Sequence, residues 1–220
     1  MNSDLTNRAV FGARPVIGTV EGLRAQIDDE KAVEALGAYP VPELSDAAGR
    51  LFTMTADIRP LYADCPSLAG RACTVRVPRG DNKGVKVAID LLRTGDVLVI
   101  DAQGFTDWCA GGFSMVRQAI LGRRLNGIVV NGAYRDIEEF RAAGIPVFGV
   151  AISPAAGPKL GPWEINLPVN CGGVVVRPND VVIGSADGVV VVPDAHTGAV
   201  LAYVQRRAEK KRSVETGVEA

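Results

Sequence analysis

Histidine is nearly absent from this sequence, because His196 is the only one among 220 residues. A zinc site built from several imidazoles is therefore excluded, and a Ser-His-Asp triad could form only around His196. The four cysteines, Cys65, Cys73, Cys109 and Cys171, contain no CxxC pair, so we expect buried, reduced thiols. Any metal site must use mostly oxygen ligands, which suit Mg²⁺ or Mn²⁺.

Blocks of like charge and long apolar runs are also missing. The 24 basic and 25 acidic residues nearly cancel, which argues against a surface for nucleic acid or an anionic membrane. No apolar run approaches the roughly 18 residues that a membrane span needs, and the opening MNSDLTNRAV has no apolar signal-peptide core. We expect a cytoplasmic protein whose partners are small molecules or other proteins.

The bulk composition is that of a globular protein. Apolar residues make up 47% of the chain and charged residues 22%, so wholesale disorder is not expected. A chain of this length suits one large domain, whereas two domains would each be small. We predict a single domain over residues 1–220.

The middle of the chain alternates between two periodicities. Apolar runs predict four strands, over 73–77, 97–101, 127–131 and 147–150. Helical spacing is readable between them, as in residues 85–92 and 113–120. This β-α-β-α order favours parallel strands covered by helices.

The two ends of the chain follow other patterns. Spaced apolar residues among charges predict a helix from Val20 to Leu36 and a second short one near 44–51. Residues 172–193 read as three short Val-rich strands separated by turn residues, which predicts an antiparallel meander. An amphipathic helix with Ala199, Val200, Tyr203 and Val204 on one face follows. The sheet system should therefore be mixed.

The most informative segment is NGIVVNGAYRDIEEFRAAG, residues 126–144. A buried strand is predicted to end at Asn131-Gly132, and Arg135-Asp136 to open a helix closed by Gly144. An aspartate is favourable in a first helical turn, whereas a cation there opposes the helix dipole by about 0.3–1 kcal/mol. A surface pair without a ligand would explain Asp136 but not Arg135.

Ligand binding explains both residues. The carboxyl end of a strand in an α/β sheet is the usual place for a ligand, and a guanidinium matches a carboxylate with two parallel hydrogen bonds. We therefore predict that Arg135 clamps a substrate carboxylate and that Asp136 binds a hard cation. The pair Gly111-Gly112 before a helix is a weak anion-binding signal.

The run NGAYRDIEEF resembles the Arg-Asp motif of the RraA-like superfamily. That superfamily includes 4-hydroxy-4-methyl-2-oxoglutarate aldolase, 4-carboxy-4-hydroxy-2-oxoadipate aldolase and the regulator of ribonuclease activity A. Further stretches occur in the family's order over roughly residues 30–210: ELSDAAGR, IRPLY, AGRACTV, VPRGDN, TGDVLVIDA, GIPVF and VRPNDVVIGSADGVVVVP. The resemblance implies an α/β fold, an αββα sandwich with mixed sheets of the swivelling-domain type.

The resemblance also implies roles for individual residues. Arg135 would bind the carboxylate of a pyruvate unit, and Asp136 would hold Mg²⁺ or Mn²⁺. The other residues that it places in the pocket are Met115 and Val116 through their backbone amides, Gly80, Asp81, Asn82 and Asp46. It further implies a homotrimer or homohexamer with the site between chains.

Two positions depart from the family pattern. Ser114 stands where the aldolases carry an aspartate that assists proton transfer, and a serine cannot act as an acid near neutral pH. A glutamate that a neighbouring subunit supplies to the metal falls at Lys211 rather than at Glu209. Because oxaloacetate decarboxylation mainly requires metal stabilisation of the enolate, these losses favour it over a full retro-aldol cycle.

The sequence therefore predicts a divalent-metal-dependent lyase with Arg135, Asp136 and Ser114 at its catalytic centre. Its substrates would be small 2-oxo acids, namely 4-hydroxy-2-oxo dicarboxylates or oxaloacetate, and pyruvate would be released. One alternative is a non-enzymatic regulator that binds a ribonuclease or another protein. Another is different chemistry on a carboxylated substrate, enabled by Ser114 and the run Asp107-Trp108-Cys109, where Trp108 faces either the substrate or a packed interface.

Overall fold

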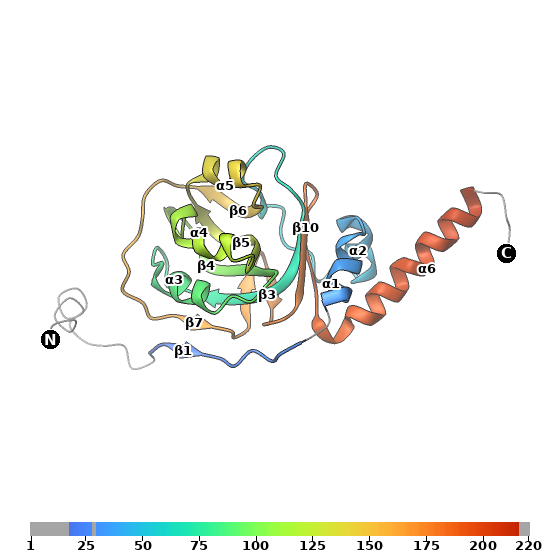
Figure 1. Cartoon of the computed structure of the whole chain (residues 1–220), viewed down its shortest axis with the longest axis horizontal. Helices are drawn as coiled ribbons and strands as arrows, with labels where there is room; N and C mark the ends of the chain where they lie inside the picture. Colours follow the sequence, from blue (N-terminus) through green and yellow to red (C-terminus); the bar gives the residue numbers. More distant parts are fainter. Residues whose placement is uncertain (1–17, 28–29, 216–220) are drawn as a thin grey trace.

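Three separate apolar cores divide the protein into four layers in the order helix, sheet, sheet, helix (Figure 1). The computed structural model describes residues 18–27 and 30–215. The prediction about the opening MNSDLTNRAV lies outside the described residues. None of the helices in the described ranges is long and apolar enough to cross a membrane.

The first sheet layer has the predicted parallel strands. In spatial order they are β3 (Leu68–Arg76), β4 (Asp96–Cys109), β5 (Leu125–Tyr134) and β6 (Val147–Ile152). The helices that follow the first three strands cover one face of this sheet: α3 (Lys83–Asp90), α4 (Phe113–Leu121) and α5 (Ile137–Ala143) (Figure 1). Two-residue strands β7 (Glu164–Ile165), β1 (Val20–Glu21) and β2 (Arg59–Pro60) extend its edges.

Strand β3 takes part in both sheet layers. Its residues 72–76 pair in parallel with β4, whereas residues 68–71 pair antiparallel with β10 (Val181–Ser185). The hairpin partner of β10 is β11 (Gly188–Val192). The strands β8 (Val169–Cys171) and β9 (Val174–Val176) form a separate antiparallel pair. The mixed α/β architecture predicted from the sequence is confirmed.

Side-chain alternation lets the β10–β11 hairpin serve two cores. On β10, Val182 packs between the two sheets, whereas Val181 and Ile183 pack under the outer helices. Because both faces are covered, the strand reads as a continuous apolar run. The outer helices are α1 (Glu30–Gly37), α2 (Val41–Ala47) and the first half of α6 (Thr197–Glu215).

Three predicted elements are corrected. The helix over Val20 to Leu36 is wrong in its first half, because 20–21 form β1 and α1 begins only at Glu30. The second helix begins earlier than predicted, at Val41, with Pro42 in its first turn, where a missing N–H costs nothing. The meander is half right, since β9 pairs with β8 instead of β10.

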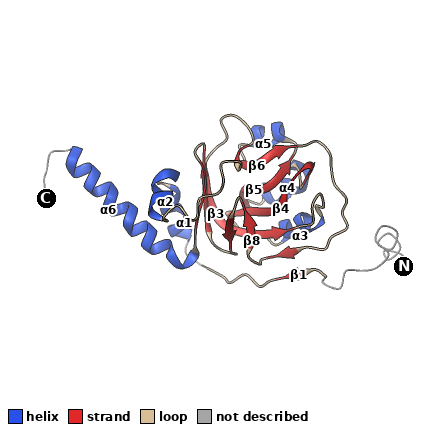
Figure 2. Cartoon of the chain, turned by 180° about the vertical axis from the view of Figure 1, so that it is seen from behind, coloured by secondary structure: helices blue, strands red, loops and turns tan. Residues whose placement is uncertain are grey.

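Helix α6 is only partly buried. Val200 and Val204 lie in the outer core as predicted, whereas Ala199 and Tyr203 are exposed. Beyond Val204 the helix extends away from the sheets, as Figures 1 and 2 show. Glu209 and Lys211 lie on this projecting half and are exposed.

Candidate functional site

The candidate site lies at the carboxyl ends of β4 and β5. Strand β5 continues through Tyr134, past the predicted end at Asn131-Gly132, and α5 begins at Ile137. Arg135 and Asp136 therefore form the link between strand and helix. Asp136 is the N-cap residue of α5, in agreement with the prediction, whereas Arg135 precedes the cap, so the argument from a cation in the first helical turn does not apply.

The side chain of Asp136 caps a neighbouring helix instead of α5. Its Oδ2 accepts a hydrogen bond from the N–H of Phe113, the first residue of α4, at 3.0 Å, and it makes no capping hydrogen bond to α5. The backbone of Asp136 is left-handed (φ 60°, ψ 42°). Outside glycine this conformation is uncommon but is adopted most readily by Asn and Asp, and it often accompanies functional sites.

Arg135 keeps most of its hydrogen-bonding capacity. Its Nη1 donates to the carbonyl of Pro154 at 3.3 Å, and its Nε lies 3.6 Å from Asp136 Oδ1. The guanidinium has five N–H donors, and its side chain is 37% exposed. A surface pair of this kind adds little stability, so the side chain is available for a carboxylate.

The start of α4 offers free backbone donors next to Asp136. Within the described part of the chain, the N–H groups of Gly112 and Ser114 donate no hydrogen bond. The Met115 N–H donates to the Gly112 carbonyl at 3.1 Å, and its predicted contact with substrate stays a prediction. Val116 lies one residue deeper, with its side chain in the inner core. Ser114 is exposed beside the Asp136 cap.

Two buried protic groups flank the site without being activated. Burial raises the pKa of the Cys109 thiol, although the nearby Arg135 opposes the shift, and a raised pKa disfavours the reactive thiolate. Burial also raises the pKa of the Tyr134 hydroxyl, which has no hydrogen-bond partner among the described residues.

The turn of Gly80, Asp81 and Asn82 lies between β3 and α3, at the same edge of the sheet. The Asp81 carboxylate is buried and accepts hydrogen bonds from the N–H groups of Lys83 (2.8 Å), Leu160 (2.7 Å) and Gly161 (3.1 Å). This carboxylate therefore anchors a loop. Gly80 packs against the ring of Trp108, which is 44% exposed.

Asp46 lies in the opposite outer layer of the chain. It is on α2, and its Oδ2 is 3.7 Å from Nη1 of Arg207 on α6. One chain does not bring Asp46 or Glu209 to Arg135 and Asp136. A shared site between chains stays a prediction for these residues.

Residues 153–157, which follow β6, were missed by the sequence analysis. Ser153 Oγ donates to the Asp107 carbonyl at 2.6 Å, and the Cys109 N–H donates to the Ala155 carbonyl at 2.7 Å. Together with the Arg135–Pro154 hydrogen bond, these contacts join the ends of β4 and β5. The only signal in the sequence is a run of small residues around Pro154, which has no periodicity.

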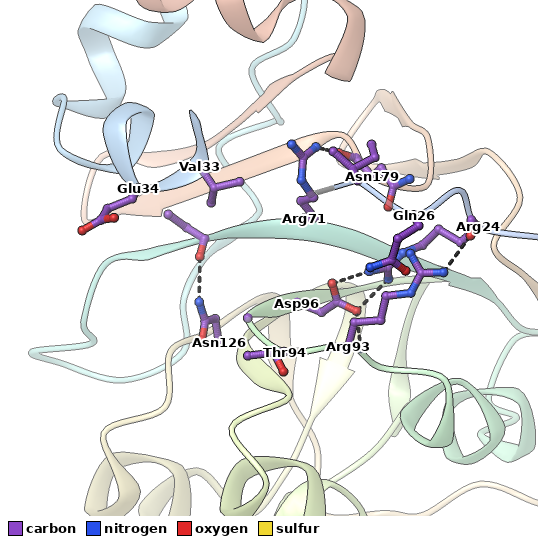
Figure 3. A pocket seen from close by; sticks show the side chains of 13 residues that line it. Arg24, Gln26, Val33, Glu34, Arg71, Arg93, Thr94, Asp96, Asn126 and Asn179 are labelled. Atoms are coloured by element: carbon purple, nitrogen blue, oxygen red, sulfur yellow. Dashed lines mark hydrogen bonds and ion pairs between the residues drawn. The ribbon is translucent and has the colours of Figure 1, made fainter. Parts of the chain in front are cut away.

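One cavity lies away from this site, at the amino ends of β3 and β4. It holds about 520 Å³ and is shown in Figure 3. Charged side chains that line it are already paired within the protein. Arg24 Nη1 donates to Asp96 Oδ2 at 2.6 Å, and Arg93 donates to the carbonyls of Arg24 and Ala25. These contacts fasten residues 18–27 to the sheet, so we assign the cavity a structural role.

A metal ion at the candidate site would have to rely on few protein ligands. Across residues 18–27 and 30–215, no group of three or more His, Cys, Asp or Glu side chains could hold a metal. Asp136 keeps Oδ1 free of hydrogen bonds and is 29% exposed. This donor set fits Mg²⁺ or Mn²⁺, which bind through one or two carboxylates plus water and substrate oxygens.

Fold and site together define an α/β protein that presents an arginine-aspartate pair at the carboxyl edge of a parallel sheet. The family model described as RraA-like, Aldolase/RraA, matches residues 41–191. The chain belongs to this family.

Relatives and solved structures agree with this assignment. A Halalkalibacterium halodurans protein, provisionally named 4-hydroxy-4-methyl-2-oxoglutarate aldolase, is 40% identical over 175 residues, 79% of this chain and 80% of its own. Streptomyces coelicolor RraAS2 shares the fold with a TM-score of 0.76 at 24% identity, over 87% of this chain and 98% of its own. The RNA-processing inhibitor RraA from Thermus thermophilus gives 0.63 at 28% identity, over 70% and 93%.

Proposed function

We propose that the protein is a divalent-metal-dependent lyase that acts on small 2-oxo acids. Its reaction would be retro-aldol cleavage of 4-hydroxy-2-oxo acids or decarboxylation of oxaloacetate, with release of pyruvate. The observation that carries the proposal is the pairing of Arg135 and Asp136 beside unpaired amides at the start of α4. The aldolase name of the Halalkalibacterium relative supports the same class of reaction.

The side chains would divide the work as follows. Arg135 would hold the substrate carboxylate with its free guanidinium N–H groups, and the N–H groups of Gly112 and Ser114 would add donors nearby. Asp136 Oδ1 would hold Mg²⁺ or Mn²⁺. When bound, such a cation supplies electrostatic stabilisation for the negative charge that develops on the 2-oxo oxygen as the C–C bond breaks.

Proton transfer is the part of the reaction that this chain supports least. Ser114 stays neutral near pH 7, and Cys109 and Tyr134 both have raised pKa values. Decarboxylation of oxaloacetate needs no proton removed from a hydroxyl group, whereas retro-aldol cleavage does. We therefore propose that oxaloacetate is turned over faster than 4-hydroxy-2-oxo acids.

Two substitutions of Asp136 separate its structural role from its proposed metal-binding role. Asn keeps an oxygen to accept from the Phe113 N–H and tolerates a left-handed backbone, but it loses the charge. Ala loses the cap, at about 1 kcal/mol, and strains the backbone by roughly 1–2 kcal/mol. Asp136→Asn should keep the wild-type Tm but lose metal-activated turnover. Asp136→Ala should have a lower Tm and should also lose metal-activated turnover.

The measurement is oxaloacetate decarboxylation with added Mg²⁺ or Mn²⁺, corrected for the rate of the free metal, together with thermal unfolding. EDTA should abolish wild-type turnover, and added metal should restore it. Full turnover after exhaustive chelation, or an Asp136→Asn variant with wild-type metal activation, would contradict the proposal.

We further propose that the protein forms a homotrimer or homohexamer. The single domain over residues 1–220 and the cytoplasmic location stay predictions.

The second candidate function is regulation of a ribonuclease, favoured by the 28% identical RNA-processing inhibitor from Thermus thermophilus. Specific binding of a ribonuclease by a protein without metal-dependent turnover would favour this candidate over the lyase.

A further inference from the structure

Two adjacent glycines precede α4, and each packs against a different side chain. A Cβ at Gly111 would lie 2.6–2.8 Å from the ring and hydroxyl of Tyr134. A Cβ at Gly112 would collide with Asp136 Oδ2 and lie 2.9 Å from Arg135 Cγ. Gly112 has φ −161° and ψ 176°, extended backbone that any residue adopts. Glycine is therefore needed at 112 for space and not for backbone freedom.

We propose that Gly112 is a positioning residue for Asp136 and Arg135. The missing side chain would let the Asp136 carboxylate lie over the first turn of α4, where it would take a divalent cation together with the carboxylate end of a 2-oxo acid. The inference rests on the proposed function. It adds Gly112 to the site as a residue that matters because it has no side chain.

The contact geometry explains how this space orients the carboxylate. Oδ2 is held by the Phe113 N–H at 3.0 Å, whereas Oδ1 makes no hydrogen bond and has only the Arg135 Nε at 3.6 Å, so Oδ1 is the oxygen that would take a cation. The left-handed backbone of Asp136 places the short side chain back over Gly112. Arg135 Cγ touches the same point, so a methyl group at 112 would displace the metal ligand and the carboxylate clamp together.

Adding a methyl group should have different effects on stability and metal binding at the two glycines. At 112 the obstacle is the end of a partly exposed side chain that can rotate away, so the fold survives and the carboxylate moves. At 111 the obstacle is a fully buried aromatic ring that cannot yield. Gly112→Ala should therefore mainly weaken metal binding, whereas Gly111→Ala should mainly lower the Tm.

The test is Mn²⁺ binding, followed by the electron paramagnetic resonance signal of free Mn²⁺, in the full-length protein. The variants are Gly112→Ala, Asp136→Asn and the two combined. Gly198→Ala is the control, because apart from its own helix backbone and chain neighbours no atom lies within 4 Å of a Cβ at that glycine. We expect Gly112→Ala to raise the Kd for Mn²⁺ by about tenfold or more, and the control to keep the wild-type Kd.

The double variant separates this role from a general structural one. If Gly112 acts through Asp136, then Gly112→Ala in the Asp136→Asn background should cause no further loss of affinity, because both changes remove one interaction. If Gly112→Ala lowers the Tm, Asp136→Gly in the same chain should recover it, because it removes the colliding carboxylate and suits a left-handed backbone.

Three outcomes would overturn the inference. Wild-type Mn²⁺ affinity in Gly112→Ala shows that the space is not needed. Additive losses in the double variant show that Gly112 acts elsewhere. A wild-type protein that binds no Mn²⁺ contradicts the proposed function itself, and with it this inference, and that result is distinguishable because it precedes any comparison of variants.

Discussion

At the scale of single residues, Arg135 is the side chain whose role is easiest to isolate. It makes one hydrogen bond, to Pro154, and a 3.6 Å contact with Asp136, and both involve a partly exposed side chain. Its replacement should therefore cost little stability. Its geometry matters more than its charge, because a planar fork matches a carboxylate and an ammonium does not.

We predict that Arg135→Lys folds normally but loses roughly 10- to 100-fold in kcat/KM, the equivalent of one charge-assisted hydrogen bond of about 1.5–3 kcal/mol. Steady-state kinetics with oxaloacetate and a thermal melt measure the two effects. Arg177→Lys is the matched control, since that exposed arginine lies far along the chain in a turn. Unchanged kinetics in Arg135→Lys would rule out the carboxylate clamp.

Ser114 allows a gain-of-function prediction. It is exposed at the second position of α4, one residue after the amide that Asp136 caps. An aspartate there would be favoured by the helix dipole and could transfer protons. Because general acid-base catalysis contributes about 10²–10⁴-fold, Ser114→Asp should raise retro-aldol cleavage of a 4-hydroxy-2-oxo acid by at least about tenfold, with little change in decarboxylation.

Pyruvate release from both substrates measures this change in preference. Fast aldol cleavage by the wild-type protein that Ser114→Asp does not improve would show that another group transfers the proton. Ser114→Asn is the control, since it changes the size of the side chain without adding an acid.

At the scale of elements, one buried ion pair helps to hold the extended segment before α1 against the sheet. The Arg24 and Asp96 side chains are 4% and 2% exposed, and Asp96 Oδ2 also accepts from the Arg93 N–H at 2.7 Å. Removing one member leaves the other charge buried without a partner, which costs about 3–5 kcal/mol. Asp96→Asn should therefore lower the free energy of unfolding by that amount.

Urea unfolding measures the loss, and the double variant Arg24→Met with Asp96→Asn is the control. If the pair acts as a unit, the double variant should be less destabilised than the sum of the single variants. A loss of less than about 1 kcal/mol in Asp96→Asn would show that water reaches the pair, as it does at exposed ion pairs.

The same segment shows why part of the fold could not be predicted from the sequence. The apolar Leu23 lies within the predicted helix range yet is fully exposed, whereas the side chain of the charged Arg24 is buried against a partner 72 residues away. Local periodicity cannot detect such a pair. The four parallel strands were predictable because each is covered on both faces and reads as an apolar run.

The sequence singles out the Arg-Asp pair of the candidate site but not the contacts that surround it. The Arg-Asp pair after β5 stands out because ligands bind at the carboxyl ends of strands. The Asp136–Phe113 hydrogen bond joins the start of α5 to the start of α4. Strand β4 continues to Cys109 through register shifts after Asp101 and Phe105. Bulges of this kind leave no periodic signal, so the positions of Trp108 and of residues 153–157 came only from the structure.

At the scale of the whole molecule, a single chain does not bring together all the residues of the predicted site. Asp46 pairs with Arg207 in the opposite outer layer, and the second half of α6 projects beyond the sheets with Glu209 and Lys211 exposed (Figure 2). Packing within the chain explains α6 only as far as Val204. A second chain would explain why the helix continues for eleven further residues.

We therefore predict a mass in solution of three or six times the 23.1 kDa of the chain, measured by light scattering at micromolar concentration. Ending the chain before Glu209 keeps Val200, Val204 and the Arg207–Asp46 contact, so the subunit should stay folded while losing activity. Mixing this truncated chain with Asp136→Asn tests a shared site directly. Assemblies that contain both chains have some sites with an intact Asp136 and an intact neighbouring helix, so two inactive proteins should recover part of the activity. A wild-type monomer, or a truncated chain with full turnover, would show that each subunit works alone.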